Sequence, residues 1–584
     1  MGGRHCPSAH PGQPGPHHRP PRDQWGGCGE VFERGEDAAG NILPGARQPV
    51  SRASAGGALP AARSFPALLL PSLLSGLLLT GAFHPWNQAW LAWLFPLPLV
   101  LGLRRWAPGP REAALGGAAA GLAHFGTSLW WITEVTPAGW AALAVYLAAY
   151  PAAWMAVLAQ AARRLPGRLQ PHHSVLFAGF AACAWTALEW VRGWLLSGFP
   201  WNPIGASQIE VLVLAQVAEL GGALLVGWMV VFGGTIIAMT LLRIVQQAGE
   251  GASMRPHAEF ITALAVVGAA AWFGIGALTR PAPVRGHLDV LLVQPRIPQD
   301  PWGSGMAAED ALQESIRLTD LALPPGRPAG LVVWPETPIP DALADLPEFD
   351  RFVKSLVPGR AEAFLFGTIR REGRVPYNSA VLALPGNSAA AVYDKMHLVI
   401  MGEYVPLADA FPFLRRLVPL GADFASGPEP VAFDLPGGWR AAPLICFEDV
   451  MARVVRSFIP LQPDLFINIT NDGWFNDSPQ SLQHFQLARM RCIELRRPML
   501  RAANNGATGW IDERGVVREL LRDPESGSVD IAGTLRTRVS IPEARMTFYA
   551  RWRDWAGWLS ALLVLAWICP PPAWFRKASG KNAS

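Results

Sequence analysis

A succession of long apolar stretches between residues 65 and 279 is the feature that most constrains how this chain can fold. A helix needs about 20 consecutive apolar residues to cross the hydrocarbon core of a bilayer. We predict eight such helices, seven in this region and one near the C-terminus. Their approximate bounds are 65–83, 87–103, 113–133, 138–162, 174–196, 211–242, 259–279 and 554–575. The composition agrees with a multi-pass membrane protein, because 51% of the 584 residues are hydrophobic and only 16% are charged.

Basic residues are unevenly distributed over the connections between these predicted helices. The connections after the second, fourth and sixth helices and the C-terminal tail contain Lys or Arg, among them Arg104, Arg164, Arg243 and Lys577. The alternate connections, FHPWN, ITEVTPAG and SGFPWNPIGASQ, contain neither. Because Lys and Arg are enriched in cytoplasmic loops, we expect both termini to be cytoplasmic and the region after the seventh helix to lie across the membrane.

The composition divides the chain into four segments. Residues 1–63 are rich in Pro, Gly, Arg and His and lack apolar periodicity, which predicts a disordered extension. Residues 64–280 form the predicted seven-helix transmembrane region. Residues 281–550 form a predicted soluble domain, and residues 551–584 contain the last helix and a cytoplasmic tail.

Short apolar runs alternate with helical patterns in the predicted soluble domain. Seven of these runs are strand-like: HLDVLLVQP, GLVVWPE, AFLFGTIRR, NSAVLALP, APLICFED, DLFINITND and PMLRAANNG. A helical pattern, SLQHFQLARMRCIELRR, separates the last two. Near-continuous apolar strands with helices between them are typical of an α/β domain with buried sheets.

Charge and cysteine spacing argue against several functional classes. The net charge of +4 is small for this length and indicates no nucleic-acid partner. The six cysteines show neither CxxC nor zinc-ligand spacing. We therefore predict no metal site, no disulfide framework and no cofactor.

Three reactive side chains stand at or near the ends of strand-like runs. They are Glu336 in LVVWPE, Lys395 in AVYDKMHLV and Cys446 in PLICFED. A thiol is a weak nucleophile until a base removes its proton or a cation stabilises the thiolate. Glu336 can be that base, and Lys395 can offset the acids Glu448 and Asp449 and later stabilise an oxyanion. Taken singly, each residue also has an ordinary interpretation, as a turn acid, a surface lysine and a core cysteine.

The motifs around these residues resemble those of a known superfamily. WPET (334–337), YDKMHLVIMGEYVP (393–406) and CFED (446–449) resemble motifs of the nitrilase superfamily, whose members use a Glu–Lys–Cys triad on an α-β-β-α sandwich. The longer match is to its membrane branch, the apolipoprotein N-acyltransferase family. SGFPWNPIGASQ (197–208) and residues 468–512 are similar to that family almost throughout.

The resemblance implies a fold and a set of site residues. The fold is a bundle of about eight transmembrane helices joined to a nitrilase-like α-β-β-α sandwich. The catalytic triad implied is Glu336, Lys395 and Cys446. The supporting or substrate-binding residues implied are Trp302, Glu403 and Glu448.

The resemblance also implies an acyl transfer with two lipid partners. Glu336 deprotonates Cys446, which attacks the ester carbonyl of a phospholipid while Lys395 holds the oxyanion. A thioester remains after the lysophospholipid leaves. The free α-amine of the diacylglyceryl-cysteine of an apolipoprotein then takes the acyl chain. The expected location is the bacterial inner membrane with the catalytic domain in the periplasm, and one site per chain makes a monomer sufficient.

Two departures from the family pattern concern neighbours of these residues. Phe447 stands where the family usually has Tyr after the nucleophile, so a role for that hydroxyl is absent or supplied elsewhere. The run usually written QGNIPQ is QPRIPQ here, with Pro295 and Arg296 close to Trp302. Neither departure touches the triad.

Two other functional hypotheses stay open at the level of sequence. A membrane-tethered amidase of the nitrilase type would use the same triad and pass the acyl group to water. A transporter or scaffold would instead require ionisable residues that line the helices. The sequence offers few of these, namely Glu134, Glu189, Arg192 and Glu219.

Overall fold

The computed structural model describes most of the chain beyond residue 63. The described residues are 64–251, 256–280, 282–298, 306–324, 326–339, 348–406, 408, 411, 423–475 and 477–569. The predicted extension at 1–63 and the expected site residue Trp302 lie outside them.

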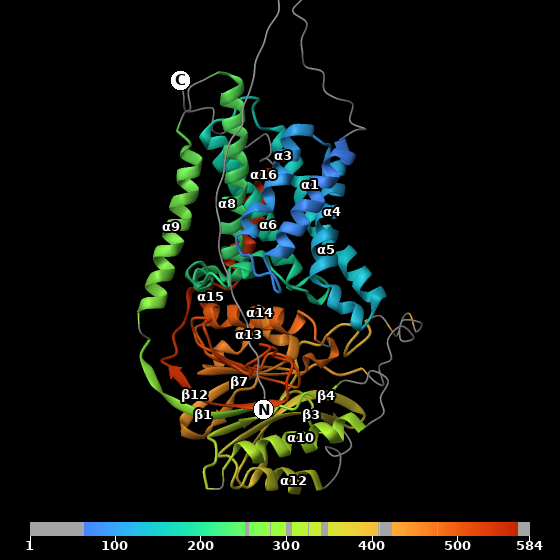
Figure 1. Ribbon diagram of the computed structural model, residues 1–584, viewed down its shortest axis with the longest axis vertical. Helices are drawn as coiled ribbons and strands as arrows, with labels where there is room; N and C mark the ends of the chain where they lie inside the picture. Colours follow the sequence, from blue (N-terminus) through green and yellow to red (C-terminus); the bar gives the residue numbers. More distant parts are fainter. Residues whose placement is uncertain are drawn as a thin grey trace, which may run out of the picture. The chain divides into compact units, whose positions relative to one another are not determined.

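Helices occupy the described chain up to residue 279 and again near its end (Figure 1). Their bounds are α1 (Ser64–Gly81), α2 (Leu91–Leu94), α3 (Pro96–Trp106), α4 (Pro110–Ser128), α5 (Pro137–Arg163), α6 (Pro171–Arg192), α7 (Leu212–Ala215), α8 (Ala218–Gly249), α9 (Ala258–Thr279) and α16 (Trp555–Ile568). Each of the eight predicted stretches therefore contains a helix. The second stretch is divided, because Pro96 occupies the first position of α3, where a proline is favoured and its missing N–H costs nothing.

Fewer helices than the eight predicted are long and apolar enough to cross a bilayer. Among the described residues four meet that criterion, α5, α6, α8 and α9, while α1 and α16 are apolar but shorter. Division at Pro96 leaves α3 with only 11 residues. The sequence of α4 is rich in Gly and Ala and begins with Arg111 and Glu112, which lowers its hydropathy. In α9 the large apolar side chains Trp272 and Ile261 are exposed, as in a helix that faces lipid.

Two six-stranded sheets follow the helices. The first has the order β12-β1-β2-β3-β4-β5 and the second the order β11-β10-β9-β8-β7-β6. The strands of the first sheet are β1 (Val284–Gln294), β2 (Leu331–Val333), β3 (Phe364–Glu372), β4 (Val375–Leu384), β5 (Asn387–Asp394) and β12 (Gly533–Pro542). Those of the second are β6 (Phe433–Leu435), β7 (Trp439–Ile445), β8 (Leu465–Thr470), β9 (Met499–Ala503), β10 (Gly509–Ile511) and β11 (Val517–Leu520). All seven predicted strands form, and β1–β2–β3 and β7–β8–β9 are parallel.

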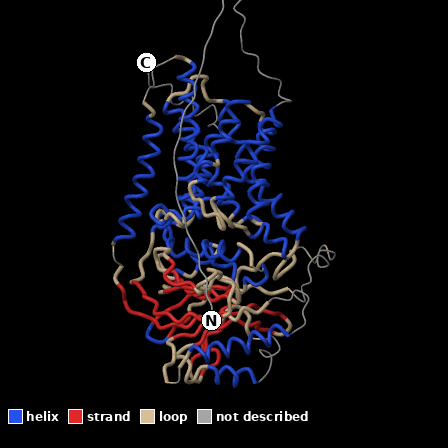
Figure 2. Tube along the Cα trace, viewed as in Figure 1, coloured by secondary structure: helices blue, strands red, loops and turns tan. Residues whose placement is uncertain are grey.

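The two sheets are stacked and covered by helices on their outer faces (Figure 2). Along β1 the side chains alternate between the two faces of the strand. Val290 packs in the core that includes Leu444 of the second sheet. Its neighbour Leu291 packs with Leu312 of α10 (Met306–Ala322) and Val353 of α12 (Glu348–Leu356). Together with α13 (Ala452–Ser457) and α14 (Gln480–Leu495) against the second sheet, these layers form the predicted α-β-β-α sandwich.

The buried helix α14 joins the sandwich to the membrane-type helices. Its residues Ala488 and Cys492 pack in the core of the sandwich, whereas Met490 packs in the core of the helical region. Polar contacts reinforce this junction. Glu494 accepts a hydrogen bond from the backbone N–H of Ala223 in α8 at 2.8 Å, and Glu219 of α8 pairs with Arg496 at 2.7 Å. The helical region is thereby held against the face of the sandwich that carries α14.

Candidate active site

The backbone changes direction sharply where β7 ends at Cys446. Cys446 has a φ of +53°, in the left-handed region that non-glycine residues rarely adopt. It begins a short 3-10 turn, Cys446–Asp449, and its carbonyl oxygen accepts a hydrogen bond from Asn468 Nδ2 at 3.0 Å. Such strain is maintained only where the surrounding structure enforces it, and it concentrates at functional sites. The half-buried thiol is thus presented at the end of a parallel strand.

The three reactive side chains predicted from the sequence come together near the end of β7. Glu336 follows β2 and Lys395 follows β5, two strands of the same sheet. Lys395 Nζ lies 3.7 Å from Glu336 Oε1, and the lysine side chain is only 1% exposed. The charges of Glu336 and Lys395 both act on the pKa of the Cys446 thiol. One carboxylate, one ammonium and one thiol therefore share a single buried site.

Glu403 holds the lysine from the opposite side. Its Oε1 accepts hydrogen bonds from Lys395 Nζ and from Asn378 Nδ2, both at 2.9 Å, and its Oε2 accepts one from the backbone N–H of Val399 at 2.8 Å. Asn378 Nδ2 also donates to Glu336 Oε1 at 2.7 Å. The amide of Asn378 therefore bridges the two carboxylates. We did not predict this residue; the signal available was a polar side chain at the start of the apolar run NSAVLALP.

Glu448 ties the turn at the nucleophile to the segment that carries the lysine. Its buried carboxylate accepts hydrogen bonds from the hydroxyl of Tyr393 at 2.8 Å and from the backbone N–H groups of Ile445, Met396 and His397 at 2.9, 2.8 and 3.1 Å. Burial raises the pKa of Glu448 to about 7, while these donors favour its ionised form. Glu448 is placed to orient backbone segments rather than to exchange protons with a substrate.

The expectation that Lys395 offsets Asp449 is wrong. Asp449 pairs instead with the guanidinium of Arg501 and with His484 Nε2, the latter at 2.7 Å. Arg501 also pairs with Asp472 at 2.9 Å. Burial alone would raise the pKa of Asp472, but Arg501 and His484 hold it well below its usual range. Arg501, which is fully buried and distant in sequence, thus neutralises the acids behind the nucleophile.

Burial and the neighbouring charges shift the pKa values of the three central groups. Burial, with a contribution from Glu336, raises the pKa of the Cys446 thiol, and Lys395 opposes the shift. Burial also raises the pKa of Glu336, which makes it a stronger base than an ordinary carboxylate. Burial would lower the pKa of Lys395, but Glu403 and Glu336 outweigh it and raise that pKa. At neutral pH the site therefore holds a protonated lysine and a neutral thiol beside a carboxyl group of enhanced basicity.

Comparison with known proteins identifies the relatives of the chain. Residues 75–236 match the apolipoprotein N-acyltransferase N-terminal domain, and residues 290–536 match the carbon-nitrogen hydrolase family. The chain is 32% identical over 519 residues to the apolipoprotein N-acyltransferase of Geobacter metallireducens, an alignment that covers 86% of this chain and 92% of the relative. The corresponding enzyme of Methylococcus capsulatus is 33% identical over 516 residues, covering 83% and 93%. The chain belongs to the apolipoprotein N-acyltransferase family.

Membership of the apolipoprotein N-acyltransferase family confirms the relationship inferred from the motifs. It identifies the chain as an acyltransferase of lipoprotein maturation, a class of membrane enzymes. Among solved structures, a CN-hydrolase superfamily protein from Xanthomonas campestris aligns with 44% of this chain and 91% of its own, at 20% identity and a TM-score of 0.33.

Five of the six residues expected at the acyltransferase site are described, and all five are adjacent in the structure. Glu336 pairs with Lys395, both are electrostatically coupled to Cys446, Glu403 contacts Lys395, and Glu448 contacts the backbone on both sides of the site. Trp302 lies outside the described residues, so its role stays a prediction.

Proposed function

We propose that this protein transfers an acyl chain from a membrane phospholipid to the free α-amine of the diacylglyceryl-cysteine of apolipoproteins, through a thioester on Cys446. The observation that carries the proposal is that Glu336, Lys395 and Cys446, which follow strands of two stacked sheets, are electrostatically coupled in one buried site. The site belongs to a sandwich that is held against apolar helices through α14. Family membership supports the choice of lipid donor and lipoprotein acceptor.

The first half-reaction forms the acyl-enzyme. Glu336 accepts the thiol proton as Cys446 Sγ attacks the ester carbonyl carbon of the phospholipid. The ammonium of Lys395 stabilises the negative charge that develops on the carbonyl oxygen. When the carbon–oxygen bond of the ester breaks, Glu336 returns the proton to the departing alkoxide. The products are a lysophospholipid and a thioester.

The second half-reaction discharges the thioester. The α-amine of the acceptor attacks the thioester carbonyl, and Glu336 accepts a proton from the amine. The carbon–sulfur bond then breaks, the amide product leaves, and the proton passes to Cys446 to restore the thiol. Glu336 thus serves as base and acid in turn, which suits a carboxyl group whose pKa burial has raised.

Glu403 and Glu448 support the triad in different ways. Glu403, together with Asn378, fixes the position of the Lys395 ammonium. Glu448 fixes the turn after β7 through the backbone N–H of Ile445. For Trp302 we propose a substrate-binding role on the basis of the family resemblance alone.

The amidase hypothesis differs only in the acceptor, which would be water. Both proposed substrates are bilayer lipids, and a soluble domain would have to withdraw their chains into water at about 0.8 kcal/mol for each exposed CH₂ group. Attachment of the sandwich to apolar helices lets these chains remain in apolar surroundings. This feature supports lipid substrates over soluble ones, and the fate of the thioester separates the acyltransferase from a membrane-tethered amidase.

Mapping of the covalent intermediate tests the proposal. Purified protein is incubated with phospholipid that carries a labelled acyl chain, quenched in acid and digested for mass spectrometry. We expect the label on the peptide that contains Cys446, in a hydroxylamine-sensitive linkage. Absence of any acylated peptide, or a label on another residue, would remove the proposed intermediate.

The proposed location is the bacterial inner membrane, with residues 281–550 in the periplasm and both termini in the cytoplasm. A reporter that is active only outside the cytoplasm should function when fused after Pro281 and fail when fused after Arg164. The reason is that Arg164 lies in a basic connection, whereas Pro281 follows the seventh predicted crossing. Reporter activity measured in whole cells checks this topology, and the inverse pattern would place the active domain in the cytosol.

A further inference from the structure

A buried ion pair near the end of α6 has no part in the proposed chemistry. Arg192 Nη2 lies 3.4 Å from Glu189 Oε1, and the two side chains are 3% and 6% exposed. Burying charges costs several kcal/mol per ion unless pairing and hydrogen bonds compensate. Ionisable residues in membrane-type helices commonly mark a functional requirement. The contacts of this pair indicate what that requirement is.

The pair holds the segment Phe199–Ile204, which connects α6 to the next helices. Arg192 Nη1 donates to the carbonyl oxygen of Trp201 at 2.7 Å and to that of Phe199 at 3.5 Å. Glu189 Oε1 accepts a hydrogen bond from the backbone N–H of Ile204 at 2.8 Å. The arginine therefore holds the start of the segment and the glutamate holds its end.

The same segment reaches the neighbour of the nucleophile. The indole ring of Trp201 is parallel to the ring of Phe447, with an interplanar angle of 1° and ring centres 6.0 Å apart. The ring of Phe199 stacks on Phe447 at 5.9 Å. Trp201 Nε1 also donates to Gln483 Oε1 of α14 at 2.8 Å. The segment thus forms an aromatic wall against Phe447, the residue that directly follows Cys446.

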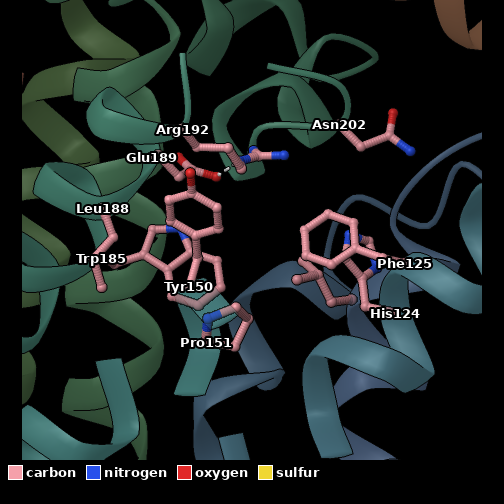
Figure 3. Close-up of a pocket in the computed structure, with 10 residues that line it drawn as sticks. His124, Phe125, Tyr150, Pro151, Trp185, Leu188, Glu189, Arg192 and Asn202 are labelled. Carbon is pink, nitrogen blue, oxygen red and sulfur yellow. Dashed lines mark hydrogen bonds and ion pairs between the residues drawn. The ribbon is translucent and has the colours of Figure 1, made fainter. Parts of the chain in front are cut away.

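A small cavity of about 20 Å³ adjoins the ion pair (Figure 3). Figure 3 shows Glu189, Arg192, Asn202 and His124 around it. Asn202 Nδ2 and His124 Nε2 are buried and have no hydrogen-bond partner among the described residues. A volume of about 10–15 Å³ suffices for one water molecule that has polar partners. If Arg192 is replaced by the shorter lysine, a water molecule in this cavity can bind the lysine ammonium. We therefore expect the Arg192→Lys variant to fold.

We propose that Glu189 and Arg192 are positioning residues for acyl transfer. They fix the Phe199–Ile204 segment, whose aromatic rings hold Phe447 and shape the space in which the phospholipid ester meets Cys446. This inference rests on the proposed acyltransferase function. A phospholipid is large and must fit against the aromatic wall to place its ester carbonyl at Cys446. A small reagent can reach the thiol without contacting this wall.

Two reactions of Cys446 in the same preparation test this role. One is single-turnover thioester formation with phospholipid, and the other is alkylation by iodoacetamide. In Arg192→Lys we expect thioester formation to slow by about 10²-fold, the effect of a displacement of about 1 Å at a reacting centre. Alkylation should keep its wild-type rate because the triad is untouched. The matched control is Arg243→Lys, which alters another buried pair, Arg243 with Glu259, remote from the sandwich and expected to change neither reaction.

A second variant separates positioning from general damage to the fold. Trp201→Ala should slow thioester formation, and adding Arg192→Lys to it should cause little further loss, because the two residues act through one segment. An unchanged rate of thioester formation in Arg192→Lys, or an equal fall in its rate of alkylation, overturns the proposal. So does an equal loss of thioester formation in Arg243→Lys. Additive losses of thioester formation in the double variant overturn it as well. Failure of the proposed function itself has a different signature, namely wild-type protein that is alkylated on Cys446 and forms no thioester.

Discussion

Cys446→Ala is expected to abolish acyl-enzyme formation. Among the site residues that the structure describes, Cys446 alone has a thiol able to form the thioester, and alanine has no nucleophilic group to replace it. The fold should be preserved, because the network behind Cys446, from Asp449 to Arg501, does not involve its sulfur atom. The measurement is the amount of labelled acyl chain bound to protein after incubation with phospholipid. No label above background is expected.

The matched control for this variant is Cys492→Ala. Cys492 is fully buried in the core of the sandwich, and burial raises the pKa of its thiol well above the ordinary value, so it is unreactive. Its replacement should leave most of the acyl-enzyme signal, measured on folded protein. A labelled thioester that survives in Cys446→Ala and disappears in Cys492→Ala would transfer the nucleophile assignment to Cys492.

Glu336→Gln and Lys395→Met should each slow thioester formation by several orders of magnitude. A general base contributes about 10²–10⁴-fold to a reaction rate, and a donor to an oxyanion about 10²–10³-fold. Glutamine keeps an oxygen for the hydrogen bond from Asn378 but cannot accept the thiol proton. Rapid-quench measurement of the first turnover separates this step from the later transfer.

Loss of the lysine charge carries a risk for folding that a second variant addresses. Lys395→Met leaves Glu336 and Glu403 buried without their cation, and breaking a buried pair costs about 3–5 kcal/mol. The double variant Lys395→Met with Glu403→Gln removes one of the two negative charges. Its thermal stability should recover while acylation stays slow. Near-normal acylation in the folded double variant would remove Lys395 from the mechanism.

The dependence of acylation on pH gives an independent test of Glu336. The base must be deprotonated to act, so the rate should fall as the pH is lowered through the pKa of Glu336, which burial raises above 4.5. The residual acylation rate of Glu336→Gln should not show this fall at low pH, the acidic limb of the profile. Surface substitutions Glu372→Gln and Lys354→Met, which alter exposed ion pairs, serve as controls and should keep both the rate and the limb.

The sequence predicted the main elements because their apolar runs are long and distinct. The seven strand-like runs and the helical pattern at α14 all formed as expected. For β5 only the end was predicted, as the strand-like run before Lys395, because the rest of NSAAAVYD is rich in alanine, which has low β-propensity. Strands β6 and β10 have only three residues each and, unlike β2 in GLVVWPE, no longer apolar run marks them. The number of membrane-type helices was overestimated because apolar composition does not reveal where Pro96 divides a stretch.

The sequence predicted only part of the candidate site, because motif resemblance finds only residues that stand in a distinctive local sequence. Motif resemblance located Glu336, Lys395 and Cys446, since each stands in a distinctive local sequence. It did not locate Asn378 or Arg501, which reach the site from other strands and have no local signature. The expectation that Lys395 offsets Asp449 arose because Asp449 stands only three residues after Cys446 in the sequence. In the structure, Asp449 after β7 meets Arg501 of β9, a strand of the same sheet that is distant in sequence.

The fate of the thioester tests the central claim most directly. Acyl-enzyme formed on Cys446 is isolated and then mixed either with a diacylglyceryl-cysteine lipopeptide in micelles or with micelles alone. The loss of label from the protein and its appearance on the lipopeptide amine are followed over time. The acyltransferase account predicts rapid transfer to the amine and slow loss to water. Equally fast discharge in both mixtures, with free fatty acid as the product, would contradict it and identify a hydrolase.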